Sequence, residues 1–198
     1  MSETNLIIAG VGGQGSILAS HIVATAAIRD GLQARVGETF GAAMRGGAVT
    51  SHVRIGKEVF APLVQKDGAE IVLSLEPLEG FRNAAKYLAK DGLLLTNTHA
   101  WIPTDVNIGR AEYPSMDSIK KAVEKLGGKI ITIDATSLAQ QARNVRTMNS
   151  VMLGALAGTG KLPISTETLK QVVKENVPPK TIDANLRAFE LGFNAVKK

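Results

Sequence analysis

Residues 5–15 read NLIIAGVGGQG, and this stretch decides the fold that the sequence predicts. The apolar run Asn5–Gly10 is typical of a buried β-strand, and Ser16–Asp30 has the apolar period of an amphipathic helix. A strand, a glycine-rich loop and a helix in this order favour a Rossmann-like α/β fold.

The glycine-rich loop is the first candidate site. Its spacing satisfies G-x-G-x-x-G, the fingerprint of dinucleotide-binding folds, in the strand-to-helix context that the fingerprint requires. Glycines let a ligand approach the backbone closely, and the N-terminus of the following helix attracts anions. Three interpretations stay open: a tight turn without a ligand, a site for an anion or a cofactor phosphate, and an NAD(P) site. The candidate residues are Gly10, Gly12, Gly13, Gln14 and Gly15.

A second glycine-rich loop is expected over Gly37–Gly47, beside the first. Glu38 follows the short predicted strand Gln33–Val36, where an acid that binds a ribose would be sought. Arg45 offers planar, bidentate donors to a carboxylate or a phosphate, and Gly46-Gly47 lets backbone N–H groups approach the same oxygen atoms. An internal Arg45–Glu38 ion pair is one interpretation, and contact with a ligand or a partner subunit is the other.

The rest of the chain continues the alternation of strands and helices. A hairpin is predicted where Ala48–Ile55 turns at Gly56-Lys57 into Glu58–Phe60. Further strands are expected at Ile71–Leu75, Leu93–Thr96 and Lys129–Asp134, and helices at Leu78–Ala89 and Ser115–Leu126. The C-terminal third is predicted to be helical at Thr136–Ala142, Met148–Gly158, Ser165–Lys174 and Ile182–Val196. We expect one domain, residues 1–198, with a mostly parallel sheet, a hairpin insertion and a helical C-terminal third.

The composition limits which metals the chain can bind. The sequence contains no cysteine, so it offers no thiolates for disulfides, zinc sites or iron–sulfur clusters. The histidines His21, His52 and His99 lie far apart in the sequence and match no ligand pattern. We assign them structural or surface roles and expect no metal site.

Charge and hydropathy restrict the environment of the chain. No apolar run approaches the ~20 residues that span a bilayer, and no secretory signal is visible, so a cytoplasmic location is expected. The net charge of +5 is modest, and aromatic residues make up only 4% of the chain. Such a composition argues against a base-stacking surface, and we predict no binding to nucleic acid.

Several further segments add a family resemblance to this outline. They are the runs GVGGQG at 10–15, ETFG at 38–41, MRGG at 44–47, SHVRI at 51–55, NSVMLGA at 149–155 and NLRAFELG at 185–192. Together they resemble the gamma-type catalytic domain of 2-oxoacid:ferredoxin oxidoreductases over nearly the whole chain. Glu38-Thr39 before the second loop and Ser51–Arg54 after it look most like the beta subunit of the indolepyruvate enzyme.

The resemblance implies a subunit of a larger enzyme. Such an enzyme decarboxylates a 2-oxoacid oxidatively to an acyl-CoA, with thiamine diphosphate (TPP), Mg²⁺, iron–sulfur clusters and CoA, and passes electrons to ferredoxin. Because the chain has no cysteine and no Gly-Asp-Gly motif followed by an Asn pair, we expect partner subunits to hold these cofactors. The isolated chain is then expected to bind none of them, to be inactive and to form a homodimer through an apolar patch.

Two other functions remain open at this point. The Gly10–Gly15 loop would also suit an NAD(P)- or flavin-dependent oxidoreductase, or a stand-alone nucleotide- or anion-binding module. No catalytic residue is assigned within this chain. The candidate binding residues are therefore the two glycine-rich loops, with Glu38 and Arg45.

Overall fold

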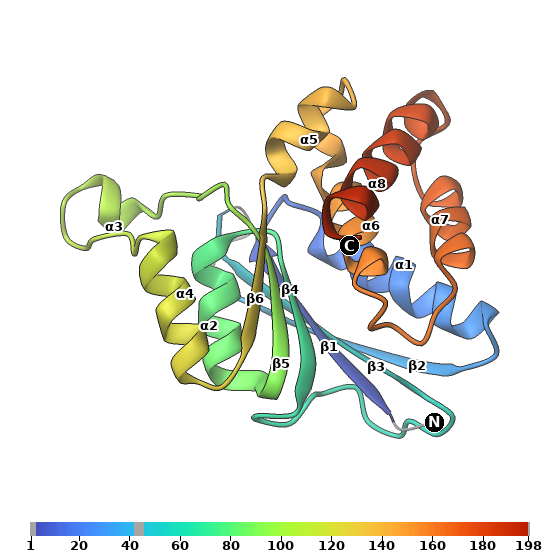
Figure 1. Ribbon diagram of the computed structural model, residues 1–198, viewed down its shortest axis with the longest axis horizontal. Helices are drawn as coiled ribbons and strands as arrows, with labels where there is room; N and C mark the ends of the chain where they lie inside the picture. Colours follow the sequence, from blue (N-terminus) through green and yellow to red (C-terminus); the bar gives the residue numbers. More distant parts are fainter. Residues whose placement is uncertain (1–2, 42–45, 198) are drawn as a thin grey trace.

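The computed structural model describes residues 3–41 and 46–197, which contain a six-stranded sheet covered by helices on both faces (Figure 1). The strand order is β2-β3-β1-β4-β5-β6. The strands are β1 (Thr4–Val11), β2 (Gln33–Phe40), β3 (Ala48–Gly56), β4 (Ala69–Ser74), β5 (Leu88–Asn97) and β6 (Lys129–Ile133).

The central strand, β1, is buried on both faces. Leu6 and Ile8 pack into the larger apolar core, and Ile7 and Ala9 pack into the smaller core on the opposite face. One edge of β1 pairs in parallel with β4, and the other edge pairs antiparallel with β3. A nearly continuous apolar run such as 6–9 is what a strand covered on both faces requires.

The hairpin lies elsewhere than the sequence predicted. β2 pairs antiparallel with β3 from Gln33 opposite Gly56 to Phe40 opposite Val49, so the hairpin is formed by these two strands, and Glu58–Phe60 forms no strand. β2 therefore runs to Phe40, whereas the sequence predicted that it ends at Val36. Gly37 suits this strand because a Cβ there would lie 3.1 Å from Cβ of Pro62, which packs against it. The prediction of a turn at Gly56-Lys57 was wrong.

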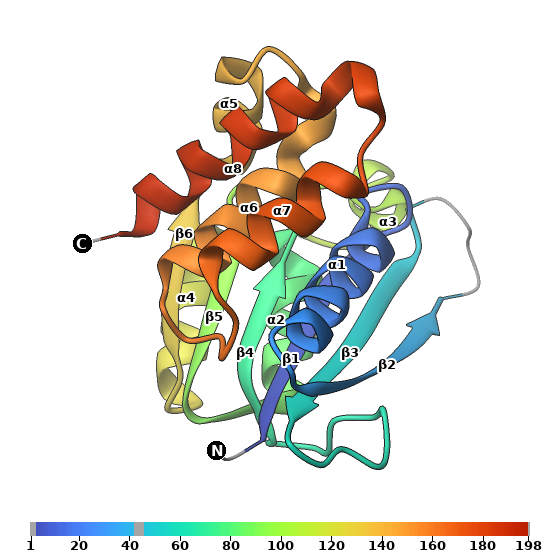
Figure 2. The ribbon, with the colours of Figure 1, turned by 90° about the vertical axis from the view of Figure 1, so that its right-hand side faces the viewer.

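Helices cover the two faces of the sheet unequally. α2 (Pro77–Tyr87) and α4 (Met116–Lys125) cover one face, while α1 (Ser16–Arg29) lies on the other with most of the C-terminal helices (Figure 2). The C-terminal elements are α5 (Ala135–Gln141), η1 (Val145–Thr147), α6 (Met148–Gly158), α7 (Thr166–Glu175), η2 (Pro179–Thr181) and α8 (Ile182–Val196). The mostly parallel sheet and the helical C-terminal third are confirmed, whereas the hairpin is made by β2 and β3 instead of by Ala48–Phe60.

The C-terminal helices α6 and α8 cross with their backbones in contact. A Cβ built on Gly192 of α8 would fall 1.9 Å from the carbonyl oxygen of Val151 in α6, so only glycine permits this approach. Ser150 on α6 donates a hydrogen bond of 2.7 Å to the side chain of Asn185 on α8, and both residues are buried. The segments 149–155 and 185–192 thus meet each other in the fold.

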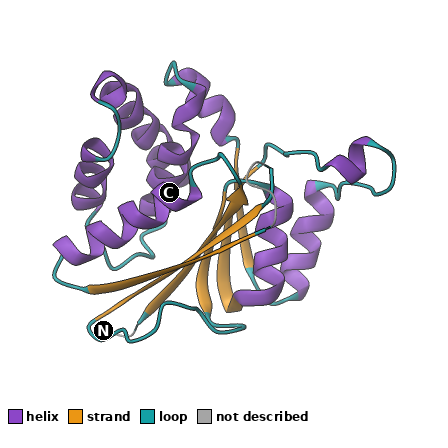
Figure 3. Ribbon diagram, turned by 180° about the vertical axis from the view of Figure 1, so that it is seen from behind, coloured by secondary structure: helices purple, strands orange, loops and turns teal. Residues whose placement is uncertain are grey.

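A long excursion connects β5 to α4. Residues 98–115 leave the body of the molecule and contain the short helix α3 (Thr104–Asn107), which has no buried residue (Figure 3). None of the helices formed by residues 3–41 and 46–197 is long and apolar enough to cross a lipid bilayer.

Candidate functional site

The glycine-rich loop lies at the carboxyl ends of the parallel strands. The chain turns from β1 to α1 on one face of the sheet, and from the neighbouring β4 to α2 on the other face. In open α/β sheets, a reversal of this kind leaves a crevice in which ligands bind. The predicted loop is therefore in the right place for a binding site.

Gln14 uses its amide group within the protein. Its Oε1 accepts a hydrogen bond of 3.0 Å from the backbone N–H of Val11, and its Nε2 donates to the carbonyl oxygen of Leu75 at 3.4 Å. Gly10 lies against this side chain, because a Cβ there would be 2.9 Å from Oε1 of Gln14. Gly10 and Gln14 thus join the ends of β1 and β4.

Gly13 and Gly15 both have a positive φ, of 102° and 86°. Gly15 is the N-cap of α1, and a Cβ there would lie 2.9 Å from Nδ2 of Asn149, so the start of α6 closes over the start of α1. A Cβ on Gly13 would meet no atom within 4 Å. Of these two glycines, Gly13 is the one whose surroundings are open.

The two glycine-rich loops are hydrogen-bonded to each other, side by side as the sequence predicted. The backbone N–H of Gly12 donates to the carbonyl oxygen of Gly47 at 2.9 Å, and the N–H of Gly46 donates to the carbonyl oxygen of Gly12 at 3.4 Å. On its other side Gly46 faces Trp101, whose Nε1 would lie 3.3 Å from an added Cβ. Arg45 belongs to 42–45, outside the described residues, so its predicted pairing stays a prediction.

Glu38 contacts α1. Its carboxylate lies 3.4 Å from Nε2 of His21 and accepts a hydrogen bond of 3.4 Å from the hydroxyl of Ser20. β3 stands between β1 and β2, so Glu38 is two strand spacings, roughly 10 Å, from β1. In dinucleotide folds the ribose-binding acid follows the strand next to β1. The topology therefore disfavours the predicted ribose role of Glu38.

An apolar cleft of about 700 Å³ opens beside the glycine-rich loop, between the N-terminal half of α1 and the ends of β2 and β3. Sequence reasoning did not find this cleft, because its walls come from three separate elements. Phe40, interpreted from the sequence as a core or interface anchor, is 61% exposed at its rim. The lining residues are Gly12, Gly13, Gly15, Ser16, Ile17, Leu18, His21, Phe40, Gly41 and Val49.

A buried carboxylate, that of Glu76, lies at the other side of the crevice. Glu76 is 1% exposed and is the N-cap of α2, accepting a hydrogen bond of 2.8 Å from the backbone N–H of Glu79. The backbone N–H of Trp101 donates to it at 3.3 Å, and the hydroxyl of Tyr113 donates as well. Burial, together with this hydrogen bond to Glu76, raises the pKa of Tyr113.

Glu79, one helical turn further on, is also mostly buried. Its carboxylate pairs with the guanidinium of Arg82 at 2.6 Å. Burial raises the pKa of Glu79, and the charge of Arg82 opposes this rise. Within 3–41 and 46–197, no three His, Cys, Asp or Glu side chains gather as a metal site would need.

Comparisons with known proteins agree with this fold. The family model for pyruvate ferredoxin/flavodoxin oxidoreductases matches residues 5–195. Indolepyruvate oxidoreductase subunit IorB of Thermococcus kodakarensis is 45% identical over all of this chain and 98% of its own length. Pyruvate synthase subunit PorC of Methanothermobacter marburgensis is 31% identical over 95% of this chain and 94% of its own length.

A solved structure gives the same result. The gamma subunit of the keto/oxoacid ferredoxin oxidoreductase from Geobacter sulfurreducens superimposes with a TM-score of 0.72 and 26% identity, over 98% of each chain. The resemblance read from the glycine-rich loops and the C-terminal helices is thereby confirmed. This chain belongs to the pyruvate ferredoxin/flavodoxin oxidoreductase family.

Proposed function

We propose that this chain is the cofactor-free subunit of an indolepyruvate-type 2-oxoacid:ferredoxin oxidoreductase. The observation behind the choice of substrate is the difference in identity, 45% to an indolepyruvate subunit against 31% to a pyruvate subunit, each over at least 95% of this chain. Partner subunits supply TPP with Mg²⁺ and the iron–sulfur clusters, and ferredoxin accepts the electrons.

The residues of the chain support a role without a catalytic centre of its own. Iron–sulfur clusters are held chiefly by cysteine thiolates, and the sequence has none. Glu76, the buried carboxylate at the crevice, already accepts hydrogen bonds from Glu79, Trp101 and Tyr113. Without cysteine thiolates, the chain does not fit an iron–sulfur cluster, and the carboxylate of Glu76 is already engaged within the protein. The isolated chain is inactive under this proposal.

The two joined glycine-rich loops form the surface that this subunit contributes. Gly12, Gly46 and Gly47 are held together by backbone hydrogen bonds. Arg45 precedes this pair of glycines in the sequence, where a guanidinium suits a ligand anion or a carboxylate of the partner. We propose that these two loops contact the ligand or the partner subunit. We also propose that residues 1–198 form a single domain.

Reconstitution tests this function. The chain is co-expressed with a thiamine-binding, cysteine-rich partner, and reduction of a low-potential acceptor is followed with indolepyruvate and with pyruvate. The complex should prefer indolepyruvate, while the purified chain alone shows no turnover and no iron–sulfur absorbance. Turnover by the chain alone, or a complex that prefers pyruvate, contradicts the proposal.

Self-association of the isolated chain is a further part of the proposal. Large apolar side chains remain exposed, among them Ile28 at 59%, Phe40 at 61% and Phe60 at 88%. Surfaces of this kind are commonly covered by a partner, and without one a homodimer covers them. Light scattering on the purified chain should give the mass of a dimer, and a strict monomer contradicts this part.

A further inference from the structure

The sheet ends at two edge strands, β2 and β6 (Figure 2). β6 pairs in parallel with β5 along one side, and within 3–41 and 46–197 no strand pairs with its other side. The outer edge of a strand presents backbone N–H and C=O groups that can pair with a strand of another chain. The sheet can therefore be extended at β6.

The two edge strands differ in their charges. β2 contains Arg35 and Glu38 along its length, and charged side chains on an edge strand oppose pairing with another strand. β6 reads KIITI, so its one charge is at its first residue, Lys129. Isoleucine and threonine are strong strand formers, and Ile130 and Ile131 are only partly buried, on opposite faces. Of the two edges, β6 is the one that invites pairing.

A small cleft lies on the face of β6 that the C-terminal helices cover. It has a volume of about 330 Å³ and is lined by Lys129 and Ile131 of β6, by Lys161 after α6 and by Val196 of α8. The side chains of a strand alternate between the two faces of its sheet. Every second side chain of an added strand would therefore lie beside this cleft.

The surroundings of the cleft are positively charged. Lys129 and Lys161 are exposed, no Asp or Glu among the described residues lines the cleft, and neither lysine forms an ion pair with a described carboxylate. Lys197, next to Val196, adds a third positive charge, with its Nζ 5.2 Å from the ring centroid of Phe193. A second copy of this chain would bring the same lysines to the edge, whereas acidic side chains would neutralise them.

The opposite face of β6 carries no charge. Ile130 packs there against the smaller core, and Thr132 is on the same face. Apolar side chains suit this face. A strand that fits both faces of the edge therefore alternates acidic with apolar residues.

We infer that the outer edge of β6 binds an extended, acidic segment of a partner protein, which adds to the sheet as a further strand. The acidic side chains of the segment lie beside Lys129 and Lys161, and its apolar side chains lie beside Ile130. The inference goes beyond the proposed function, because β6 is at the edge of the sheet opposite the β2–β3 hairpin and its glycine-rich loop.

Peptide binding to the full chain tests this inference. The probe is a short peptide in which glutamate and valine alternate. One comparison peptide has glutamine in place of each glutamate, and another has the same composition with the glutamates and the valines in two blocks. At low ionic strength the alternating acidic peptide should bind at least about fivefold more tightly than either.

Nuclear magnetic resonance locates the bound peptide. The backbone amide signals of residues 130–132 should shift when the alternating acidic peptide is added. Absence of binding, or shifts confined to other residues, overturns the inference. Equal affinity for the blocked peptide indicates attraction between charges without strand pairing, and equal affinity for the glutamine peptide indicates that the lysines play no part. Either result also overturns the inference.

Charge reversal identifies the lysines. The double variant Lys129→Glu with Lys161→Glu should keep its thermal stability, because both side chains are exposed, and should bind the acidic peptide at least about tenfold more weakly. Lys57→Glu with Lys180→Glu is the matched control, since it changes two exposed lysines away from β6 and alters the net charge equally. Equal losses in the two double variants would reflect net charge alone and overturn the inference.

A second copy of this chain is the alternative occupant of the edge. If the peptide does not bind and the reversal of Lys129 and Lys161 alters self-association in light scattering, β6 pairs with another copy and the inference is wrong. The outcome for the proposed function is separate. A chain that supports indolepyruvate turnover but binds no acidic peptide loses only this inference, and a chain that binds the peptide at β6 but supports no turnover loses only the proposed function.

Discussion

Gly154 of α6 lies directly against the backbone of Phe189 in α8: a Cβ built on Gly154 would fall 1.9 Å from the carbonyl oxygen of Phe189. A backbone atom cannot move aside as a flexible side chain can, so the helices must separate to admit any larger residue.

We expect Gly154→Ala to lower the free energy of unfolding by about 1–3 kcal/mol or more, since over-packing a tight core costs this much. Denaturant unfolding measures the change. Gly56→Ala is the control, because a Cβ there would make only ordinary contacts of 3.4 Å and longer. Equal stability of the two variants would show that α6 and α8 do not touch in solution.

The stability of the chain should fall in mild acid because of His52. This side chain is 2% exposed on β3, and its Nδ1 accepts a hydrogen bond of 3.2 Å from the backbone N–H of Val64. Burial, and then the positive charge of Lys86, lower its pKa below the usual value of 6.5. As the pH falls below 6.5, His52 binds a proton in the unfolded chain but stays neutral in the folded chain.

The contribution of His52 to stability is therefore full above pH 6.5 and is lost below it, with a slope of up to about 1.4 kcal/mol per pH unit. Unfolding in urea between pH 5 and pH 7.5 measures this slope. His52→Gln keeps an acceptor for Val64 but does not titrate, so its slope should be shallower. Parallel curves for the two proteins would exclude this origin.

Glu76 should hold the excursion 98–115 in place. Glu76→Ala leaves the N–H groups of Glu79 and Trp101 and the hydroxyl of Tyr113 without their acceptor, at a cost of about 2–5 kcal/mol. Because Trp101 is the only tryptophan, its emission reports on the excursion and should shift to longer wavelength.

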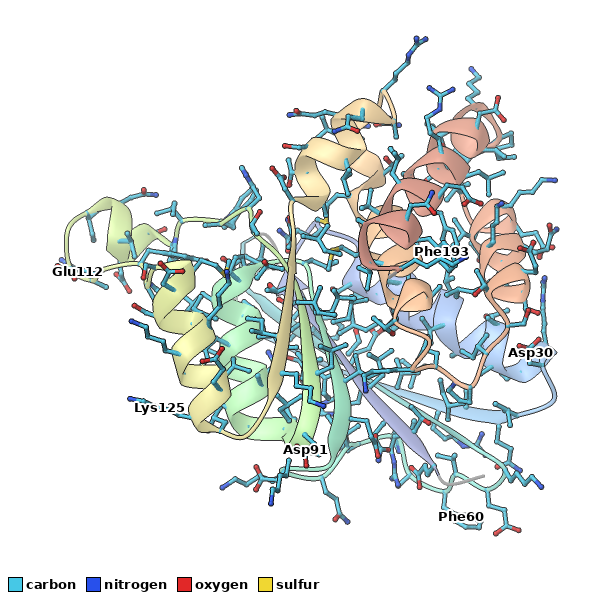
Figure 4. The ribbon with its side chains drawn as sticks, viewed as in Figure 1. Asp30, Phe60, Asp91, Glu112, Lys125 and Phe193 are labelled. Atoms are coloured by element: carbon cyan, nitrogen blue, oxygen red, sulfur yellow. The ribbon has the colours of Figure 1, made fainter. Side chains whose placement is uncertain are left out.

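Glu112→Ala is the matched control for Glu76, since Glu112 lies exposed on the same excursion (Figure 4). It should leave both stability and emission unchanged. If Glu76→Ala also left the emission of Trp101 unchanged, the excursion would not depend on this carboxylate.

Arg45→Lys tests the second loop in the assembled enzyme. Lysine keeps the charge but loses the bidentate fork, so the reconstituted complex should lose at least about tenfold in activity while the isolated chain keeps its melting temperature. Arg35→Lys on the exposed edge strand β2 should change neither quantity. A lower melting temperature, with activity falling only in proportion to the folded fraction, would instead indicate that Arg45 pairs within its own loop.

NAD and NADP should bind poorly despite the G-x-G-x-x-G pattern. Glu38, the ribose-binding acid that the sequence suggested, contacts His21 from a strand that is not adjacent to β1. Calorimetry should find no low-micromolar affinity for either dinucleotide. A low-micromolar dissociation constant would restore the dehydrogenase interpretation.

Local patterns in the sequence predicted most of the fold. A few neighbouring residues suffice to recognise each of these patterns: the apolar run 6–9, the glycine-rich stretch 10–15 and the helical C-terminal segments. The hairpin was missed because Gly37 and Glu38 are poor strand formers, and only their pairing with β3 makes them a strand.

The placement of the candidate site was predicted in part for the same reason. The two glycine-rich loops are visible as motifs, and their hydrogen bonds confirm that they lie together. The hydrogen bonds of Glu76 to Trp101 and Tyr113 join residues 25 and 37 positions apart, and no local pattern relates them. The cleft was missed because it depends on the tertiary placement of α1 against β2 and β3.

The central position of β1 has a consequence for synthesis on the ribosome. β1 is made before both of its partners, β3 and β4, so its second edge stays unpaired until residue 74 has emerged. At translation rates of about 5–20 residues per second, roughly 3–15 seconds pass between the synthesis of β1 and that of β4. The nascent chain therefore exposes Leu6–Ala9 to chaperones before both strands that flank β1 have been made.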